Sequence, residues 1–141
     1  MSPQPYAHLL PAERVLWARY LRGHPLPAEQ LDYDARLGQG RPSDPTLPQS
    51  IQDDWIRLSQ QRVDVIRWEG LQGTIYEVTP TARRAAFGAL IMYRRLFAEK
   101  YPDRPAPHLV LVTTDIHPEI ARMCAAEGIL VELLPPAGVE G

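Results

Sequence analysis

The sequence predicts an α/β fold, in detail an α+β arrangement in which helices flank a mixed sheet of about five strands. Two β-rich runs, 62–68 and 74–79, are separated by a short glycine-containing segment, which is typical of an antiparallel hairpin. The compact apolar run 108–113 has the composition of a strand that is buried on both faces and parallel to a neighbour. Helical patterns alternate with the later strands, so we expect helices on both faces of the sheet.

Size and composition bound the class of protein. The 141 residues predict one domain over 1–141, with a core over about 11–134 and loose termini. No apolar run approaches the roughly 20 residues of a transmembrane helix, and the first five residues lack the features of a signal peptide, so we expect no membrane association. The single Cys124 excludes an intramolecular disulfide and is typical of a reducing, cytoplasmic compartment.

Two biases and the net charge add weaker information. Proline occurs 15 times, and Lys100 is the only lysine among the 15 basic residues. Because loop prolines lower the entropy of the unfolded chain, we take these biases to indicate a thermophilic, GC-rich source. The net charge of −2 and the pI of about 6.1 are unfavourable for broad phosphate neutralisation, although a local basic patch is compatible with them.

The first half of the chain predicts two helices and one strand. A helix over 11–22 has Pro11 in its first turn, and a strand over 31–37 alternates apolar and charged residues. The loop 38–49 is long enough to suggest a binding role. A short helix then begins at Ser50, its expected N-cap. The expected inner faces are Ala12, Val15, Leu16 and Tyr20 in the first helix and Ile51, Trp55 and Leu58 in the second, where Asp53 completes the cap.

The second half predicts the hairpin and three further elements. Pro80 ends the second hairpin strand because it has no N–H for the ladder. A long helix over 81–101 follows, then a helix over 117–127 and a last strand over 129–134. The long helix has a small-residue apolar face of Ala85, Ala86, Ala89, Leu90, Tyr93 and Phe97, and we expect Trp17, Trp55 and Trp68 in the core.

The hairpin carries the candidate site. If the turn is symmetrical about residues 70–71, Ile66 lies opposite Ile75 and Asp64 lies opposite Glu77. Side-chain alternation then places Asp64, Glu77 and Thr79 on one face of the sheet. Two carboxylates directly opposite repel each other unless a cation lies between them. Mg²⁺ accepts such a pair, together with water and a substrate phosphate.

These residues also carry a family resemblance. Asp64 lies in the run Arg-Val-Asp-Val-Ile, and Glu77 lies in the run Tyr-Glu-Val-Thr-Pro, which an Ala/Gly-rich helix follows. The pattern resembles the PD-(D/E)XK nuclease superfamily, most closely its small phage-encoded and bacterial members. Glu13, the run 33–38 and the run 86–93 are similar to the family's surrounding elements. The resemblance implies a restriction-endonuclease-like core, a phage origin, and a site where Asp64 and Glu77 hold Mg²⁺ with Glu13 as a third carboxylate.

The sequence departs from the family at Thr79. The family usually has a lysine two residues after the glutamate, where it orients the attacking water and stabilises negative charge. Threonine has no charge, so it loses an electrostatic contribution on the order of a few kcal/mol. Arg83 or Arg84 could bring positive charge from the next helix, but arginine stays protonated and cannot act as a base. Lys100 is too far along that helix to substitute, so we expect weak or vestigial catalysis.

Three functions follow from this pattern. We favour a catalytically degenerate nuclease-fold protein, without a cofactor, that binds a protein partner such as host transcription or defence machinery or another phage protein. The second is an active Mg²⁺-dependent DNA endonuclease. The third is a non-catalytic nucleic-acid-binding protein that uses Arg83 and Arg84. Arg36 and Arg41, beside the long loop, are further candidate binding residues.

The same residues have a purely structural interpretation. One hairpin carboxylate could pair with Arg62 or Arg36 while the other is solvated, without a metal. Glu13 would then only favour the N-terminus of its helix, and the arginines of the long helix would form a solvated face. The histidines have no ligand spacing, which excludes a zinc site. Cys124 is expected to be a small buried hydrophobe.

Overall fold

The computed structural model describes residues 8–136, and most of the expected loose termini, residues 1–7 and 137–141, lies outside the described residues. Leu9, also expected in the loose N-terminus, is instead buried in a core cluster. The main sheet has five strands in the order β1-β4-β5-β7-β9. Its β1, β4 and β5 are antiparallel neighbours, whereas β5, β7 and β9 are parallel. The predicted mixed sheet is therefore confirmed. Its strands are β1 (Leu31–Asp32), β4 (Val65–Glu69), β5 (Gln72–Val78), β7 (His108–Thr113) and β9 (Ile129–Leu133).

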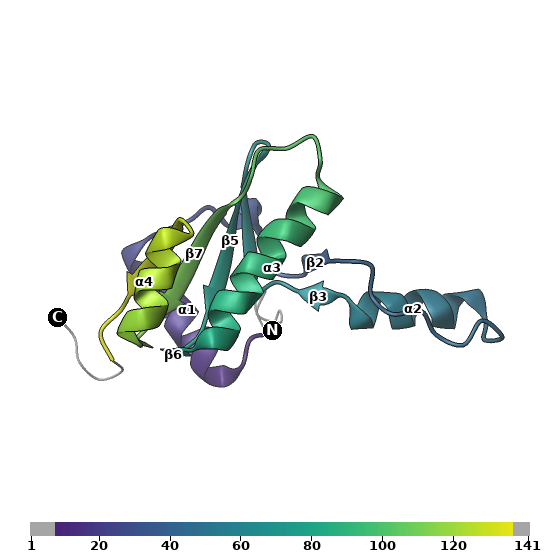
Figure 1. Cartoon of the computed structure of the whole chain (residues 1–141), viewed down its shortest axis with the longest axis horizontal. Coiled ribbons are helices and arrows are strands. Elements are labelled where there is room, and N and C mark those ends of the chain that lie inside the picture. The colour runs from purple at the N-terminus through teal and green to yellow at the C-terminus, as the bar shows by residue number, and fades with distance from the viewer. Residues whose placement is uncertain (1–7, 137–141) are drawn as a thin grey trace.

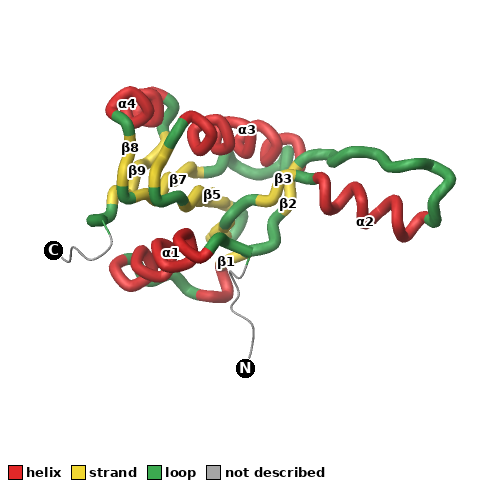
Figure 2. Tube along the Cα trace, turned by 90° about the horizontal axis from the view of Figure 1, so that it is seen from below, coloured by secondary structure: helices red, strands yellow, loops and turns green. Residues whose placement is uncertain are grey.

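Helices cover both faces of this sheet, as Figure 2 shows. The long α3 (Arg84–Lys100) and α4 (Pro118–Ala126) lie on one face, and α1 (Pro11–Gly23) lies on the other. Each face has its own apolar core. The helices α3 and α4 are the crossovers that make β5, β7 and β9 parallel. The predicted strand 108–113 is confirmed, and the last helix and strand end within one residue of the prediction.

The inner face of α1 is rotated from the predicted one. Trp17 is fully buried, whereas Ala12 and Val15, expected inside, are exposed. The Trp17 indole N–H donates to the Tyr33 hydroxyl at 2.9 Å, and its ring packs against Tyr76 of β5 with centroids 5.2 Å apart. The largest aromatic side chain of the helix therefore decides which face turns inward.

The predicted strand 62–68 is broken before Asp64. Val63 is fully buried, and its N–H donates to the carbonyl oxygen of Ala35 at 3.0 Å. The chain then turns, so β4 begins at Val65, and Gln61–Arg62 forms a separate strand, β3. The hairpin register beyond the break is as predicted, because Ile66 pairs with Ile75.

The long helix begins later than predicted. Thr81–Ala82 forms a short strand, β6, which pairs in parallel with β8 (Asp115–Ile116), so α3 starts at Arg84. Pairing with a distant segment outweighs helix propensity here, because Ala82 is buried in the core below α3. The buried face of α3 is Ala86, Leu90, Tyr93 and Phe97; Ala85 is exposed and Ala89 is half-buried.

A projecting arm replaces the predicted strand 31–37. After β1 and the preceding 3-10 helix η1 (Ala28–Gln30), the chain forms β2 (Arg36–Leu37), which pairs with β3. This ribbon carries the loop 38–48 and α2 (Gln49–Ser59) away from the sheet, as Figure 1 shows.

Two predictions about α2 are wrong. Pro48, not Ser50, is the N-cap, and the Asp53 carboxylate accepts from the Gln49 amide at 2.8 Å. The predicted inner face is exposed because the arm carries α2 away from both cores; α2 has no buried residue. Among the three tryptophans only Trp17 is fully buried, Trp68 is half-buried, and Trp55 is exposed. Over residues 8–136, no helix has the length and apolar character to cross a membrane.

We predict opposite effects for two glycine substitutions. A Cβ on Gly73 would lie 2.9 Å from Cζ of Phe97, which is packed in the core and cannot withdraw, so Gly73→Ala should lower the free energy of unfolding by about 1–3 kcal/mol. A Cβ on Gly88, in α3, would meet nothing within 4 Å, so Gly88→Ala should raise it by roughly 0.5–1 kcal/mol. Urea unfolding measures both, and destabilisation of similar size in both variants would contradict the prediction.

Candidate functional site

The hairpin brings its two carboxylates together at the start of β4 and the end of β5. Asp64 lies immediately before β4, and its Oδ2 accepts from the Val78 N–H at 2.8 Å. Glu77 shares a face of β5 with Ile75, which belongs to the core under α3. The Oε2 of Glu77 is buried and has no hydrogen-bond partner. The site therefore contains an acidic oxygen that no group of the described chain satisfies.

Burial and mutual repulsion shift both acids in the same direction. Burial raises the pKa of Glu77 well above its ordinary value, and the nearby Asp64 and Glu13 raise it further. Burial also raises the pKa of Asp64; the Val78 N–H lowers it in part, and Glu13 raises it. No cation contributes to either shift. The free site therefore holds at least one proton near neutral pH, because two adjacent charges in low dielectric are unfavourable.

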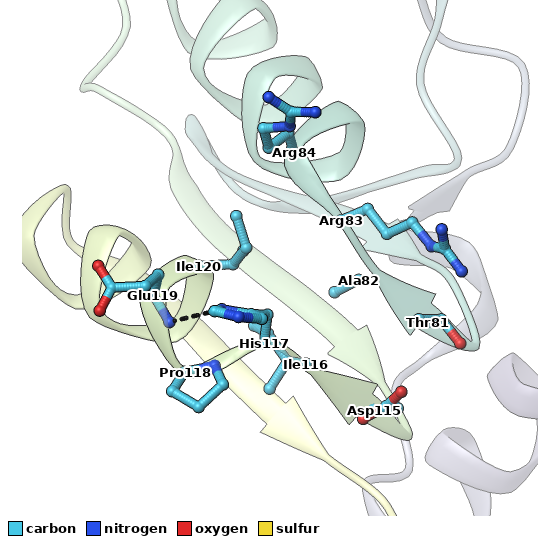
Figure 3. A pocket seen from close by; sticks show the side chains of 10 residues that line it. All are labelled: Thr81, Ala82, Arg83, Arg84, Asp115, Ile116, His117, Pro118, Glu119 and Ile120. Carbon is cyan, nitrogen blue, oxygen red and sulfur yellow. Dashed lines mark hydrogen bonds between the residues drawn. The ribbon is translucent and has the colours of Figure 1, made fainter.

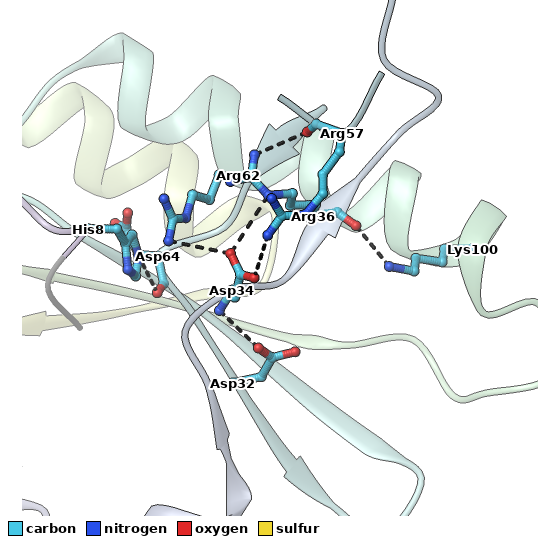
Figure 4. Close-up of polar contacts among 8 residues, drawn as sticks. All are labelled: His8, Asp32, Asp34, Arg36, Arg57, Arg62, Asp64 and Lys100. Atoms are coloured by element: carbon cyan, nitrogen blue, oxygen red, sulfur yellow. Dashed lines mark hydrogen bonds and ion pairs between the residues drawn. The ribbon is translucent and has the colours of Figure 1, made fainter. Parts of the chain in front are cut away.

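The arginines that could neutralise these acids bind another residue. Asp34 lies 2.9 Å from Arg57, 3.4 Å from Arg62 and 3.7 Å from Arg36. Figure 4 shows this cluster beside Asp64. No ion pair joins Arg62 or Arg36 to a hairpin carboxylate within the described chain, contrary to the structural interpretation of the hairpin. The guanidinium of Arg36 also donates to the Arg57 carbonyl at 3.1 Å, so its role as a binding residue stays a prediction.

Thr79 and Glu13 make hydrogen bonds of their own. The Thr79 hydroxyl donates to the Thr81 carbonyl at 3.2 Å, and the Thr79 N–H donates to the Val112 carbonyl at 3.0 Å. Thr79 thus supplies no positive charge to the site. Glu13 accepts from the Leu10 N–H at 3.0 Å, which fastens the start of α1. It is nevertheless near enough to raise the pKa of both acids.

Two neighbours of the site were not found from the sequence. The His8 ring lies 3.0 Å from the backbone oxygen of Asp64. Tyr93 of α3 has its hydroxyl 3.4 Å from the Arg62 carbonyl, and its pKa is raised by burial and then by Glu77 and Asp64. Tyr93 could be placed only on the inner face of a helix, and His8 precedes the first periodic pattern. No sequence signal connects either residue with the hairpin.

The basic candidates lie in two separate places. Arg83 and Arg84 line a cavity of about 740 Å³ between the first turns of α3 and α4, shown in Figure 3. Asp115 and Glu119 line the same cavity, so its charge is mixed. Arg41 lies in the arm, where its N–H donates to the Ser59 hydroxyl at 2.6 Å. The cavity is at the same end of the sheet as the hairpin carboxylates, because β5 ends shortly before α3 begins.

The donor set fits a divalent cation with few protein ligands. Asp64 and Glu77 offer carboxylate oxygens, including the unpaired Oε2 of Glu77, and Mg²⁺ often takes one or two carboxylates plus water and phosphate. Among the described residues, no group of three or more histidine, cysteine or acidic side chains could hold a metal, so Glu13 does not complete such a set. Cys124 is buried in the core, as predicted.

Two solved structures resemble the fold. A repair endonuclease from Pyrococcus abyssi matches with a TM-score of 0.51 and 15% identity over 87% of this chain and 47% of its own. The structure of an EndoMS–dsDNA complex matches with a TM-score of 0.52 and 16% identity over 93% of this chain and 48% of its own. The chain thus spans about half the length of both. The fold is restriction-endonuclease-like, as predicted.

Sequence comparison adds no relative. No protein-family model matches the chain, and a search of curated proteins gives no significant match. The likeness to the two endonuclease structures is therefore a likeness of fold alone.

We predict that Glu77 makes stability depend on pH. An acid whose pKa is raised by folding keeps its proton when the unfolded chain, with a glutamate pKa of about 4.3, has lost it. The free energy of unfolding must therefore fall as pH rises above the pKa of the unfolded-state glutamate. The Tm of Glu77→Gln should match that of the wild type at about pH 4 and exceed it by roughly 3 °C or more at about pH 8.

The matched control is Glu99→Gln, which removes an exposed glutamate of α3. It should leave the pH profile of the Tm unchanged in differential scanning calorimetry. A Glu77→Gln variant whose difference from the wild type is the same at both pH values would refute the assignment.

Proposed function

We propose that this chain is a nuclease-fold protein that keeps a divalent-cation site, cleaves DNA weakly or not at all, and acts by binding a protein partner. One observation carries the proposal: two half-buried carboxylates, one with an unpaired oxygen, lie beside a neutral residue, Thr79, at the position where the resembled family has a lysine. Asp64 and Glu77 would hold the ion. The Thr79 hydroxyl is turned toward the Thr81 carbonyl and offers no charge to a phosphate.

The chemistry explains how the chain could bind a divalent ion and still cleave DNA weakly or not at all. A divalent ion bound here would lower the pKa of water and neutralise charge that develops on a phosphate. The residues of this chain would supply the ligands, and the Val78 N–H would hold the Asp64 carboxylate in place. Thr79 occupies the position where the resembled family has a lysine that stabilises negative charge, and such a group contributes on the order of a few kcal/mol.

We predict that Mg²⁺ or Mn²⁺ stabilises the protein in a pH-dependent way. The ion competes with protons for Asp64 and Glu77, so binding releases protons and strengthens as pH rises. The increase in Tm on adding either ion should be larger at about pH 8 than at about pH 5, and EDTA should reverse it.

Asp64→Asn should abolish this increase, and Asp103→Asn, which changes an exposed acid, should not. Isothermal calorimetry on the same proteins gives the stoichiometry. If Asp64→Asn keeps the full increase in Tm, the ion binds elsewhere and the cation site is wrong.

We also predict a gain of function. Thr79→Lys places an ammonium group two residues after Glu77, so Mg²⁺-dependent cleavage of plasmid and linear DNA should rise by roughly 100-fold or more over the wild type. Thr46→Lys, which changes an exposed threonine of the loop 38–48, is the control and should have no effect. Strong wild-type cleavage that is lost in Asp64→Ala would instead favour the alternative of an active Mg²⁺-dependent endonuclease.

Protein binding is supported by surface and charge. The arm exposes large apolar side chains, and the net charge of −2 does not favour bulk nucleic acid. The partner could be host transcription or defence machinery or another phage protein. The phage origin, the thermophilic source and the cytoplasmic location stay predictions.

Nucleic-acid binding is a second candidate with one specific observation. Arg83 and Arg84 line the large cavity, and one of the similar structures is a complex with double-stranded DNA. This candidate requires duplex binding that weakens steeply with salt and is lost when both arginines are replaced.

A further inference from the structure

Within the arm, residues 36–62, the loop 38–48 packs along one side of α2. Gly40 has a positive φ of 70°, and a Cβ there would lie 2.3 Å from the carbonyl oxygen of Ile56, so only glycine allows this close approach. The Gln52 amide donates to the Leu47 carbonyl at 2.8 Å, and the Arg41 N–H donates to the Ser59 hydroxyl at 2.6 Å. The loop therefore covers the side of α2 that carries residues 52, 56 and 59.

A stripe of large apolar side chains lies on the uncovered side of α2. Ile51, Trp55 and Leu58 are 47%, 53% and 67% exposed, and their spacing of four and three residues places them along one line of the helix. Leu47, 41% exposed, lies just before this helix. Single exposed apolar residues are common, but a contiguous stripe on a helix without a buried residue indicates a contact surface.

The stripe is held ready for binding by the base of the arm. Arg57 near the end of α2 pairs with Asp34 at 2.9 Å, and its carbonyl accepts from Arg36 at 3.1 Å. Lys100 of α3 donates to the Arg36 carbonyl at 2.9 Å. These contacts fasten the arm to the domain before any partner binds, so little ordering entropy opposes docking.

We infer that the α2 stripe docks into an apolar groove, rimmed by basic residues, on a different protein. The inference deepens the proposed protein-binding function and rests on it. An amphipathic helix that enters a groove uses anchors at this spacing, and tryptophan is enriched among the residues that contribute most to binding. Trp55, at the centre of the stripe, is the main anchor.

Charge decides the kind of partner. Asp54 is three residues from Ile51 and four from Leu58, so it flanks the stripe. The midpoint of the stripe lies between residues 54 and 55. An antiparallel, two-fold pairing of two copies through the stripe would therefore set the two Asp54 carboxylates side by side, where they repel. The same carboxylate, with Asp53 next to it, also disfavours a phosphate backbone, whereas a basic rim on another protein is complementary to it.

The test is a pull-down in which three forms of the full chain are immobilised as bait. The lysate comes from the cells that naturally produce this protein. The wild type and Leu71→Ser, which changes a residue 62% exposed in the β4–β5 turn, should retain the same protein, and Trp55→Ala/Leu58→Ser should not. The double variant should keep the wild-type Tm because α2 has no buried residue.

The recovered protein is then purified and titrated against each form by calorimetry. We expect the Kd to rise at least tenfold in the double variant and severalfold in Asp54→Lys, and to stay unchanged in Leu71→Ser.

Four results would overturn the inference, and they are distinguishable. A partner that binds the double variant with unchanged Kd leaves protein binding intact but places it elsewhere. A wild-type dimer in sedimentation velocity that becomes monomeric in the double variant makes a second copy the occupant. If the wild type retains no protein, the proposed function fails as well. If a duplex DNA probe binds in a Trp55-dependent way, the occupant of the stripe is nucleic acid and not a protein groove.

Discussion

The antiparallel register of β4 with β5 is the constraint on which the candidate site depends. Ile66 pairs with Ile75, so the residue before β4, Asp64, is directed to the end of β5 beside Glu77. There its carboxylate accepts from the Val78 N–H. A slip of one residue would move every side chain of the strand to the other face, bury charge in the opposite core and expose apolar residues. Core packing therefore fixes the two acids against each other despite their repulsion.

The repulsion is left uncompensated by the surrounding residues. Asp34 binds Arg36, Arg57 and Arg62, and Thr79 occupies the position where the resembled family has a lysine. An acid pair that served only stability would be expected to have a cation beside it, because an unpaired buried charge is costly. The unpaired oxygen of Glu77 is thus the observation on which the proposed cation site rests.

One break in the chain creates both surfaces to which we assign a role. Val63 is buried against Ala35, and the chain turns at Asp64. On one side of the turn, Gln61–Arg62 closes the ribbon that carries α2 outward; on the other, Asp64 enters the site. The Asp34 cluster lies between the two surfaces, because it holds Arg57 of α2 and Arg62 beside Asp64. The arm and the acidic site are therefore neighbours in space as well as in sequence.

The sequence by itself determined the elements whose signal is local. The hairpin register followed from its turn, the strand 108–113 from an apolar run, and the last helix from Pro118 and its flanking residues. It also placed Asp64 beside Glu77, because the register of the hairpin leads to these two residues without knowledge of the other strands. These predictions depend on periods of two and of 3.6 residues, which the sequence shows directly.

Only the tertiary structure showed where pairing with a distant strand interrupts a predicted helix or strand. The pairing of β6 with β8 delayed the start of α3, and the pairing of β2 with β3 broke two predicted strands. Ile51, Trp55 and Leu58 have the spacing of a core face, and spacing cannot tell whether another surface of the same chain covers them. Only the direction in which the ribbon leaves the sheet shows that they stay exposed. The roles of Tyr93 and Asp34 could not be predicted either, because they arise from contacts between segments far apart in sequence.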